Sequence, residues 1–157
     1  MAYADYTYFS SLYSGVTEAD FNRMAWDASK LMDYHTTGVD GFAKLRTHFP
    51  TDEYDIEAVK RCCCALVSLL LKIEAAENAS GLITREDGTV SGKVVSSVSS
   101  GSESISYSVS GNTAFDKAVS DREQRSVLFA TEIRHYLSGV KDANGVNLLF
   151  MGVYPRV

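Results

Sequence analysis

The stretch TDEYDIEAVKRCCCALVSLLLKIEAAEN, Thr51 to Asn78, carries the strongest periodic pattern in the sequence. Its apolar residues recur every three or four positions, which places their side chains on one face of an α-helix that Thr51 or Asp52 can cap. Further apolar residues widen this face to more than half of the circumference, so the stretch predicts a long helix at the centre of a helical bundle. The main stripe and the residues that widen it are Tyr54, Ala58, Val59, Cys62, Leu66, Leu69, Leu70 and Ile73, and then Cys63, Val67 and Ala76.

Two other long helices are expected, one before and one after this segment in the sequence. The first runs from Thr17 to about Thr36, and the second runs from Asn112 or Thr113 to about Ser138. Both have apolar stripes at helical spacing. A short helical turn is expected around Phe42 to Thr47. The predicted fold class is therefore mainly α: a small bundle of three long and one or two short helices in a single domain, residues 1–157.

A serine-rich stretch, KVVSSVSSGSESISYSV, Lys93 to Val109, allows two interpretations. Its composition is that of a flexible Gly/Ser linker. Its spacing is instead that of paired β-strands, because large residues alternate with serines after Gly101 and lie four apart before it. A linker has no need of this spacing, so we expect a projecting β-hairpin or extended loop at about residues 93–110. The large residues concerned are Val94, Val98, Ile105, Tyr107 and Val109.

Charge and hydropathy exclude several classes of protein. The formal net charge is -5, and the fifteen Lys and Arg residues are scattered, which disfavours a protein that clamps nucleic acid through its phosphates. The N-terminus lacks the pattern of a signal peptide, so we expect synthesis and retention in the cytoplasm. The longest apolar run, CCCALVSLLLKI, is far shorter than the roughly 20 residues that a membrane-spanning helix needs, so no membrane association is expected.

No constellation of residues in the sequence predicts catalysis. Cys62, Cys63 and Cys64 are consecutive, so on a helix their side chains point about 100 degrees apart and cannot converge on one tetrahedral ion. They are interpreted as small buried hydrophobic residues. The three histidines, His35, His48 and His135, stand in no metal-binding or catalytic motif, and no nucleotide-binding motif occurs. The sequence thus predicts no enzyme, no catalytic residue, no metal site and no cofactor.

Several segments together resemble a known family. DYTYFSSLYSG, followed by TEADFNRMAWDASKLMDYHTTG, is similar to the N-terminal signature of the head-tail connector proteins of tailed bacteriophages, the small adaptors of the virion neck. The central VKRCCCALVSLL, the serine-rich VSSVSSGSESISYS and the final LLFMGV are similar to later parts of the same family, in the same order. The resemblance therefore extends over nearly the whole chain.

This resemblance implies a structural role in the virion. The chain is expected to form a ring of about twelve copies by cyclic symmetry. The ring would dock on the portal protein, continue the DNA channel, and bind a stopper or tail-completion protein below, so that it joins the DNA-filled head to the tail. Genome DNA would pass through without sequence-specific binding. The acidic charge is then consistent either with plain solubility or with an acidic channel wall to which DNA does not adhere.

The resemblance also gives the serine-rich segment a partner. A two-stranded hairpin is marginally stable alone in water, so one that projects from a small bundle needs a surface to lie against. In a ring, that surface is the neighbouring subunit, and small serine side chains permit close approach. The residues predicted at this subunit interface are Val94, Val98, Ile105, Tyr107 and Val109.

The C-terminal tail, at about residues 147–157, is apolar where a chain end is ordinarily polar and frayed. Exposed apolar area of this size usually marks an interaction site, so docking on a partner is expected, with the portal as that partner. The alternative is that the tail folds back as a cap on its own bundle. The residues predicted to dock are Leu148, Leu149, Phe150, Met151, Val153 and Tyr154.

Two other functions remain as alternatives. The chain could be a different virion part, such as a tail-completion or head-closure protein, with other neighbours in the neck. It could also be a cytoplasmic helical protein outside virions, such as a regulator. Portal and capsid genes beside the gene for this chain would indicate a virion protein. Their absence would favour the second alternative, a protein outside virions.

Overall fold

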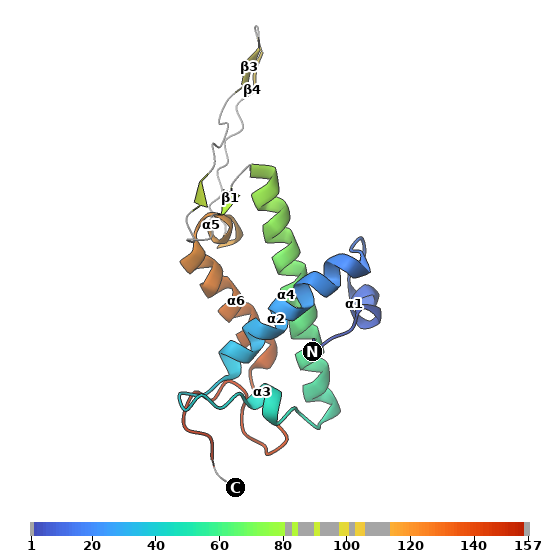
Figure 1. Ribbon diagram of the computed structural model, residues 1–157, viewed down its shortest axis with the longest axis vertical. Coiled ribbons are helices and arrows are strands. Elements are labelled where there is room, and N and C mark those ends of the chain that lie inside the picture. The colour runs from blue at the N-terminus through green and yellow to red at the C-terminus, as the bar shows by residue number, and fades with distance from the viewer. Residues whose placement is uncertain are drawn as a thin grey trace. The chain divides into compact units, whose positions relative to one another are not determined.

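The computed structural model describes residues 2–80, 83–84, 90–91, 98–100, 103–105 and 114–155. These residues are mainly helical (Figure 1), which confirms the mainly α character of the predicted fold class. The described helices are α1 (Tyr6–Leu12), α2 (Glu18–Thr36), α3 (Lys44–Thr47), α4 (Glu53–Ser80), α5 (Ala114–Ser120) and α6 (Arg122–Leu137). The described strands are β1 (Ile83–Thr84), β2 (Val90–Ser91), β3 (Val98–Ser100) and β4 (Glu103–Ile105).

The chain divides into two compact units. One consists of residues 1–71 and 129–157, and the other of residues 72–128. The first unit contains α1, α2, α3, most of α4 and the end of α6, together with the loops and the tail that follow α6. The residues that the sequence singles out for partner docking at the C-terminus all belong to this first unit.

Helix α2 forms where the periodic pattern predicts it. The Thr17 hydroxyl oxygen accepts a hydrogen bond from the backbone N–H of Asp20 at 3.2 Å, which satisfies a free donor at the first turn. Glu18 and Asp20 place negative charge at the positive end of the helix dipole. The apolar face is buried as expected, and it contains Phe21, Met24, Ala25, Ala28 and Met32.

Helix α1 is an element that the periodic pattern does not predict. It has seven residues, and the residue that caps it is Asp5, whose carboxylate accepts a hydrogen bond from the N–H of Tyr8 at 2.8 Å. Its one buried residue is Phe9, whose ring lies 5.0 Å from that of Phe21 on α2 and 5.0 Å from that of Tyr13. This short helix is therefore held by aromatic packing on α2 rather than by its own propensity.

Helix α4 is the core element of the first unit, as its composition predicts. The residues from Cys62 to Val67 are all buried, so the helix is enclosed on every side over this stretch. The prediction is wrong at one end: Tyr54 was placed on the buried stripe, but it is 81% exposed. Tyr54 lies in the first turn of α4, where the chain has only begun to enter the core.

The helix expected over residues 112–138 is instead two helices, α5 and α6, which meet at Asp121. The Asp121 carboxylate accepts hydrogen bonds from the N–H groups of Glu123, at 2.8 Å, and Gln124, at 3.4 Å, and so begins α6. The Arg125 side chain donates to the carbonyls of Ala118 and Val119, each at 2.9 Å, at the end of α5. Side chains thus satisfy two of the N–H groups and two of the carbonyls that the break leaves without helical partners.

Arg125 also forms an ion pair with Glu77 of α4, with 2.5 Å between Nη2 and Oε1. Both side chains are less than one quarter exposed, so water screens this pair less than an exposed one. All of these groups belong to the second unit. Arg125 therefore joins α4, α5 and α6 within that unit.

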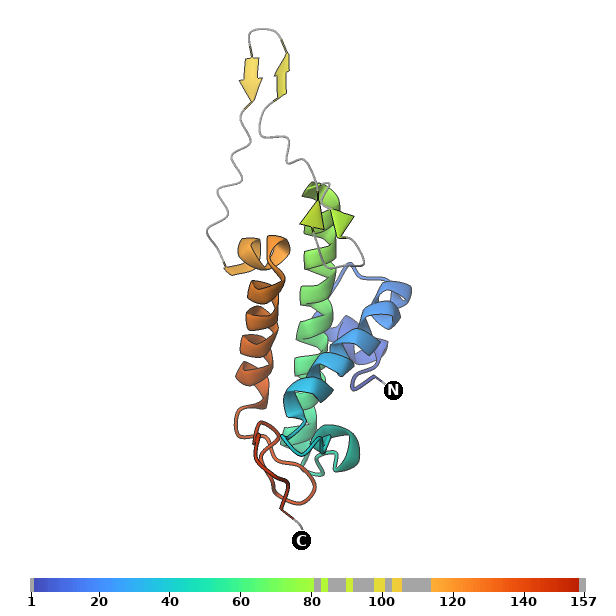
Figure 2. The same ribbon diagram turned by 60° about the vertical axis from the view of Figure 1, so that its left-hand side comes forward.

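Between α4 and α5 the described residues form two short antiparallel pairs (Figure 2). Strands β1 and β2 pair through Ile83 with Ser91, and β3 and β4 pair through Val98 with Ile105. Val94, Tyr107 and Val109 lie outside the described residues. Contact with a neighbouring subunit stays a prediction for all five of the apolar residues expected at that interface: Val94, Val98, Ile105, Tyr107 and Val109.

Candidate docking surfaces

The first part of the C-terminal tail is built into the fold of its own chain. The chain turns after α6 at Gly139, whose positive φ of 86° favours glycine, and Lys141 then forms a β-bridge with Asn147. The N–H of Leu148 donates to the carbonyl of Val140 at 2.9 Å, and the Leu148 side chain is fully buried. Leu148 is thus a core residue, and its side chain is not accessible to a partner.

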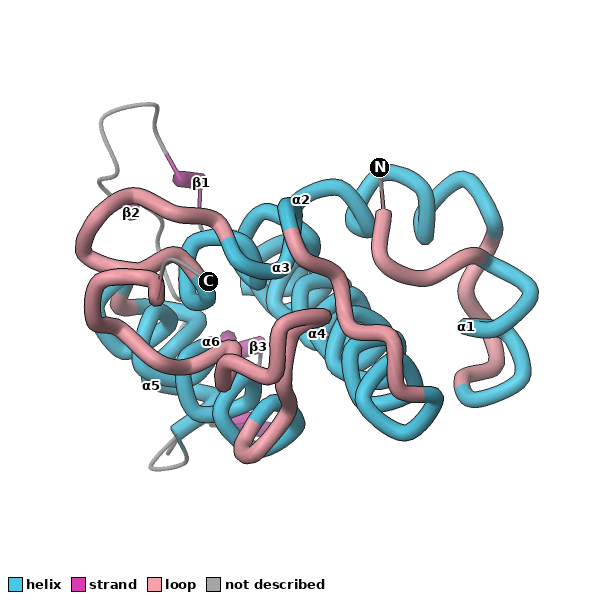
Figure 3. The backbone as a smooth tube through the Cα atoms, turned by 90° about the horizontal axis from the view of Figure 1, so that it is seen from below, coloured by secondary structure: helices cyan, strands magenta, loops and turns pink. Residues whose placement is uncertain are grey.

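The next part of the tail is bound by the loop between α2 and α3. The N–H of Val39 donates to the carbonyl of Met151 at 3.0 Å, and the N–H of Tyr154 donates to the Asp40 carboxylate at 2.8 Å. The approach of the two backbones is close, because a Cβ atom at Gly38 would lie 2.8 Å from the carbonyl oxygen of Gly152. Figure 3 shows this loop and the tail at the same end of the first unit.

A buried lysine strengthens this attachment. Lys44, the first residue of α3, is almost completely buried, and its ammonium group donates to the carbonyl of Phe150 at 2.5 Å. Burial lowers the pKa of Lys44, and the nearby carboxylates of Asp40 and Asp142 oppose that shift. The carboxylates and the carbonyl together offset the cost of placing an ammonium group inside the protein.

Tyr154 is held by its ring and by its hydroxyl. The ring lies 4.2 Å from that of Phe42 and is stacked 5.5 Å from that of His48. The hydroxyl donates to the Asp142 carboxylate at 2.6 Å and accepts a hydrogen bond from the side-chain amide of Asn144 at 3.1 Å. Burial and the bond to Asp142 raise the pKa of Tyr154. Tyr154 therefore anchors the tail to the rest of its own chain.

The anchored tail leaves an apolar patch exposed. Phe150, Met151 and Val153 project from it, and Val39 and Tyr34 lie on the adjoining loop and helix. A groove of about 520 Å³ lies beside the patch, and both Tyr34 and Met151 line it together with Leu149, His35 and Arg134. We call the five exposed residues the tail surface: Tyr34, Val39, Phe150, Met151 and Val153.

The six residues predicted to dock therefore separate into two groups. Phe150, Met151 and Val153 are exposed and Leu149 lines the groove, whereas Leu148 is buried and Tyr154 is bound by its own chain. Sequence reasoning missed Tyr34 and Val39. Tyr34 stands just outside the apolar stripe of α2, and Val39 lies between two glycine-containing turns, so neither has a periodic signal.

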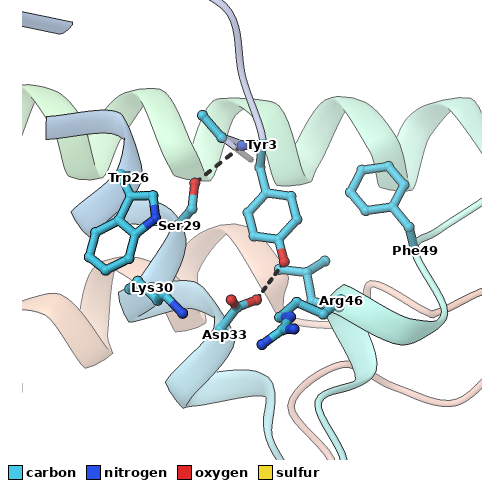
Figure 4. A pocket seen from close by; sticks show the side chains of 9 residues that line it. Tyr3, Trp26, Ser29, Lys30, Asp33, Arg46 and Phe49 are labelled. Atoms are coloured by element: carbon cyan, nitrogen blue, oxygen red, sulfur yellow. Dashed lines mark hydrogen bonds between the residues drawn. The ribbon is translucent and has the colours of Figure 1, made fainter. Parts of the chain in front are cut away.

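A second surface is a pocket of about 600 Å³ beside α2 (Figure 4). Trp26, Lys30 and Asp33 come from α2, Arg46 comes from α3, and Tyr3 and Phe49 come from the segments before α1 and after α3. We call it the Trp26 pocket. Its full lining is Ala2, Tyr3, Trp26, Ser29, Lys30, Asp33, Leu45, Arg46 and Phe49.

Hydrogen bonds fix one wall of the Trp26 pocket. The Tyr3 hydroxyl donates to the Asp33 carboxylate at 2.5 Å, and the Tyr3 N–H donates to the Ser29 hydroxyl at 3.2 Å. Burial and Asp33 raise the pKa of Tyr3. The Tyr3 ring is stacked 5.9 Å from that of Phe49. The N-terminal segment is thereby held against α2 and forms a rigid side of the pocket.

The three cysteines are buried, free thiols on α4. Burial raises the pKa of each of them, to about 12 for Cys64. Such thiols are protonated at neutral pH and are poor nucleophiles and poor metal ligands. Among the described residues, no group of three or more His, Cys, Asp or Glu side chains is placed to hold a metal ion.

Replacing Cys62 with alanine is expected to lower the free energy of unfolding by about 1 kcal/mol, because a small buried side chain is lost. Urea unfolding of the purified protein measures this change. Metal analysis of the unsubstituted protein, purified without added metal, is the companion measurement. Stoichiometric zinc in that sample would contradict a purely structural role for the cysteines.

Comparisons of the chain with protein family models, with curated proteins and with solved structures find no match. In the part of the chain that the structure describes, no helix combines the length and apolar character needed to cross a bilayer.

Proposed function

We propose that this chain is a structural protein of the bacteriophage neck: an adaptor subunit that forms a ring, docks on the portal and joins the head to the tail. The observation that carries the proposal is the tail surface, an exposed apolar patch that the chain's own fold holds in position. The sequence resemblance to head-tail connector proteins supports the same role, and the mainly helical fold is consistent with it.

The anchoring of the tail favours docking. A flexible apolar tail would lose conformational entropy on binding, whereas Leu148, Lys44 and Tyr154 already hold this one. The side chains of the tail that remain exposed are large and apolar, and clusters of exposed apolar side chains mark interaction surfaces. Docking on a partner and folding back on the bundle are thus compatible, because the same segment does both: its anchors cap the subunit and its exposed side chains bind the portal.

 

The serine-rich segment is proposed as the contact between subunits of the ring. Its support is the alternation of large residues with serines, together with the pairing of Val98 with Ile105 in β3 and β4. A short two-stranded ribbon gains stability when it lies against another surface, and a neighbouring copy provides one. This proposal for the residues 93–110 is separate from the one for the tail surface.

The alternative virion role is a different neck component, such as a tail-completion or head-closure protein. Such a protein would also present an apolar docking surface, so the identity of the partner distinguishes the two roles. Binding of the purified chain to isolated portal supports the adaptor, and binding only to tail components supports the alternative. A helical protein outside virions would bind neither.

Replacing Val153 with aspartate is expected to leave the fold intact but to reduce the yield of tailed particles about tenfold or more, because docking would bury an unpaired charge. Complementation of a phage that lacks the gene, with electron microscopy of the lysate, measures this yield. DNA-filled heads without tails should accumulate.

A matched control is Val127→Asp, which introduces the same charge at an exposed valine of α6 that lies outside the tail surface. This variant should support normal yields of tailed particles. Equal losses with both variants, or normal yields with Val153→Asp, would contradict docking through the tail surface.

A further inference from the structure

The Trp26 pocket combines aromatic surface with positive charge. Trp26 is 56% exposed, and the Lys30 ammonium group lies 5.1 Å from the centre of its ring. Arg46 is also exposed at the pocket, and within the described part of the chain neither Lys30 nor Arg46 forms an ion pair. The one carboxylate that lines the pocket, Asp33, accepts the Tyr3 hydroxyl. The pocket therefore suits an aromatic group that carries negative charge beside it.

The same chain presents such a group at the start of α4. Tyr54 is 81% exposed, the largest exposed fraction among the large hydrophobic residues of the described chain. Asp52 and Glu53 precede it and are also exposed. Asp52 accepts hydrogen bonds from the N–H groups of Tyr54, at 3.0 Å, and Asp55, at 3.3 Å, so the first turn is capped and Tyr54 is held on a rigid element. We call Asp52, Glu53 and Tyr54 the Tyr54 knob.

We propose that the Trp26 pocket binds the Tyr54 knob of a second copy of this chain. The Tyr54 ring would lie against Trp26 and Phe49, and the Glu53 carboxylate would pair with Lys30 or Arg46. Aromatic packing supplies the affinity, and the opposite charges select the partner and the register. The pocket and the knob are different surfaces, and repeated contacts between unlike surfaces generate a cyclic ring when the rotation between neighbouring copies closes.

The biological role of this contact, as one interface of the neck ring, rests on the proposed function. The contact itself can be tested without a portal. Sedimentation velocity of the purified full chain over a range of concentrations measures its self-association. We expect reversible self-association of the unsubstituted chain, weakened about tenfold or more by Lys30→Glu or by Glu53→Lys, since each substitution places like charges opposite one another.

The decisive result is the rescue. An equimolar mixture of the two variants, or one chain that carries both substitutions, restores an attractive charge pair and should restore self-association. Both residues are exposed, so thermal unfolding should be nearly unchanged and serves as the check that each variant is folded.

Tyr54→Ala tests the aromatic part of the contact, and Tyr34→Ala is its matched control, since Tyr34 is 74% exposed but lies outside the Trp26 pocket. Only Tyr54→Ala should weaken self-association. An unsubstituted chain that is monomeric up to its solubility limit, charge variants that do not rescue each other, or equal effects of both tyrosine variants would each overturn the proposal.

These failures are distinguishable from failure of the proposed function. Val153→Asp changes the tail surface and should leave self-association in solution intact. A chain that does not use the Trp26 pocket could still dock on a portal through its tail surface, and that would be seen in the yield of tailed particles.

Discussion

Replacing Leu148 with alanine is expected to lower the free energy of unfolding by about 2–5 kcal/mol, the largest effect among the substitutions considered for stability. Leu148 is fully buried, and its N–H is bound to the carbonyl of Val140. Truncation therefore removes packing and leaves a cavity that fixed neighbours fill only in part. Urea unfolding followed by circular dichroism measures the change.

Val153→Ala is the control, because Val153 is an exposed residue of the same tail. Its effect should stay within about 0.5 kcal/mol, as for most surface substitutions. Equal effects of the two variants would show that Leu148 is not part of the core. The same reasoning predicts that deletion of residues 148–157 makes the subunit melt at a lower temperature.

Replacing Lys44 with methionine is expected to lower the free energy of unfolding by about 1–3 kcal/mol, because the Phe150 carbonyl loses its charged donor. Methionine has a similar length and is apolar, so the substitution removes the ammonium group with little change in packing. The carboxylates of Asp40 and Asp142 also lose a nearby cation.

The effect of Lys44→Met should be strongest in the tail. Hydrogen exchange of the amides in residues 148–154 should become faster, while the amides of α4 change less, because local opening costs less than global unfolding. Lys141→Met is the control, since Lys141 is exposed. Unchanged exchange in the tail of Lys44→Met would contradict a role for this lysine in anchoring it.

The long periodic segments were predictable because their signals are local. The stripes of α2 and α4 follow from spacing alone, and the structure buries their central residues, whereas Leu69 and Leu70 of α4 stay partly exposed. Tyr54 was misplaced because periodicity gives the face of a helix but not how far along the helix the core extends. Helix α1 was missed because seven residues are too few for a periodic signal, and its stability comes from the contact of Phe9 with Phe21.

The break at Asp121 has a signal of its own in the sequence. Asp121 followed three residues later by Gln124 has the spacing of a capping box, which marks the start of a helix. A continuous apolar stripe across residues 112–138 concealed it. Helix pattern and cap pattern are separate signals, and here the cap gave the correct boundary.

The anchors of the tail could not be predicted from the sequence. Lys44 and Phe150 are 106 residues apart, and Asp40 and Tyr154 are 114 residues apart. A lysine in a short polar helix gives no sign that it is buried, because burial depends on which distant carbonyl and carboxylates surround it. The apolar character of the tail indicated a surface, but only the fold separates its anchors from its exposed residues.

The most direct test of the proposed role is cryo-electron microscopy of the neck in virions of the phage that encodes this chain. We expect a ring of this chain between portal and tail, with Phe150, Met151 and Val153 of each copy in contact with the portal. Absence of the chain from purified virions, or its presence only outside the neck, would contradict the account.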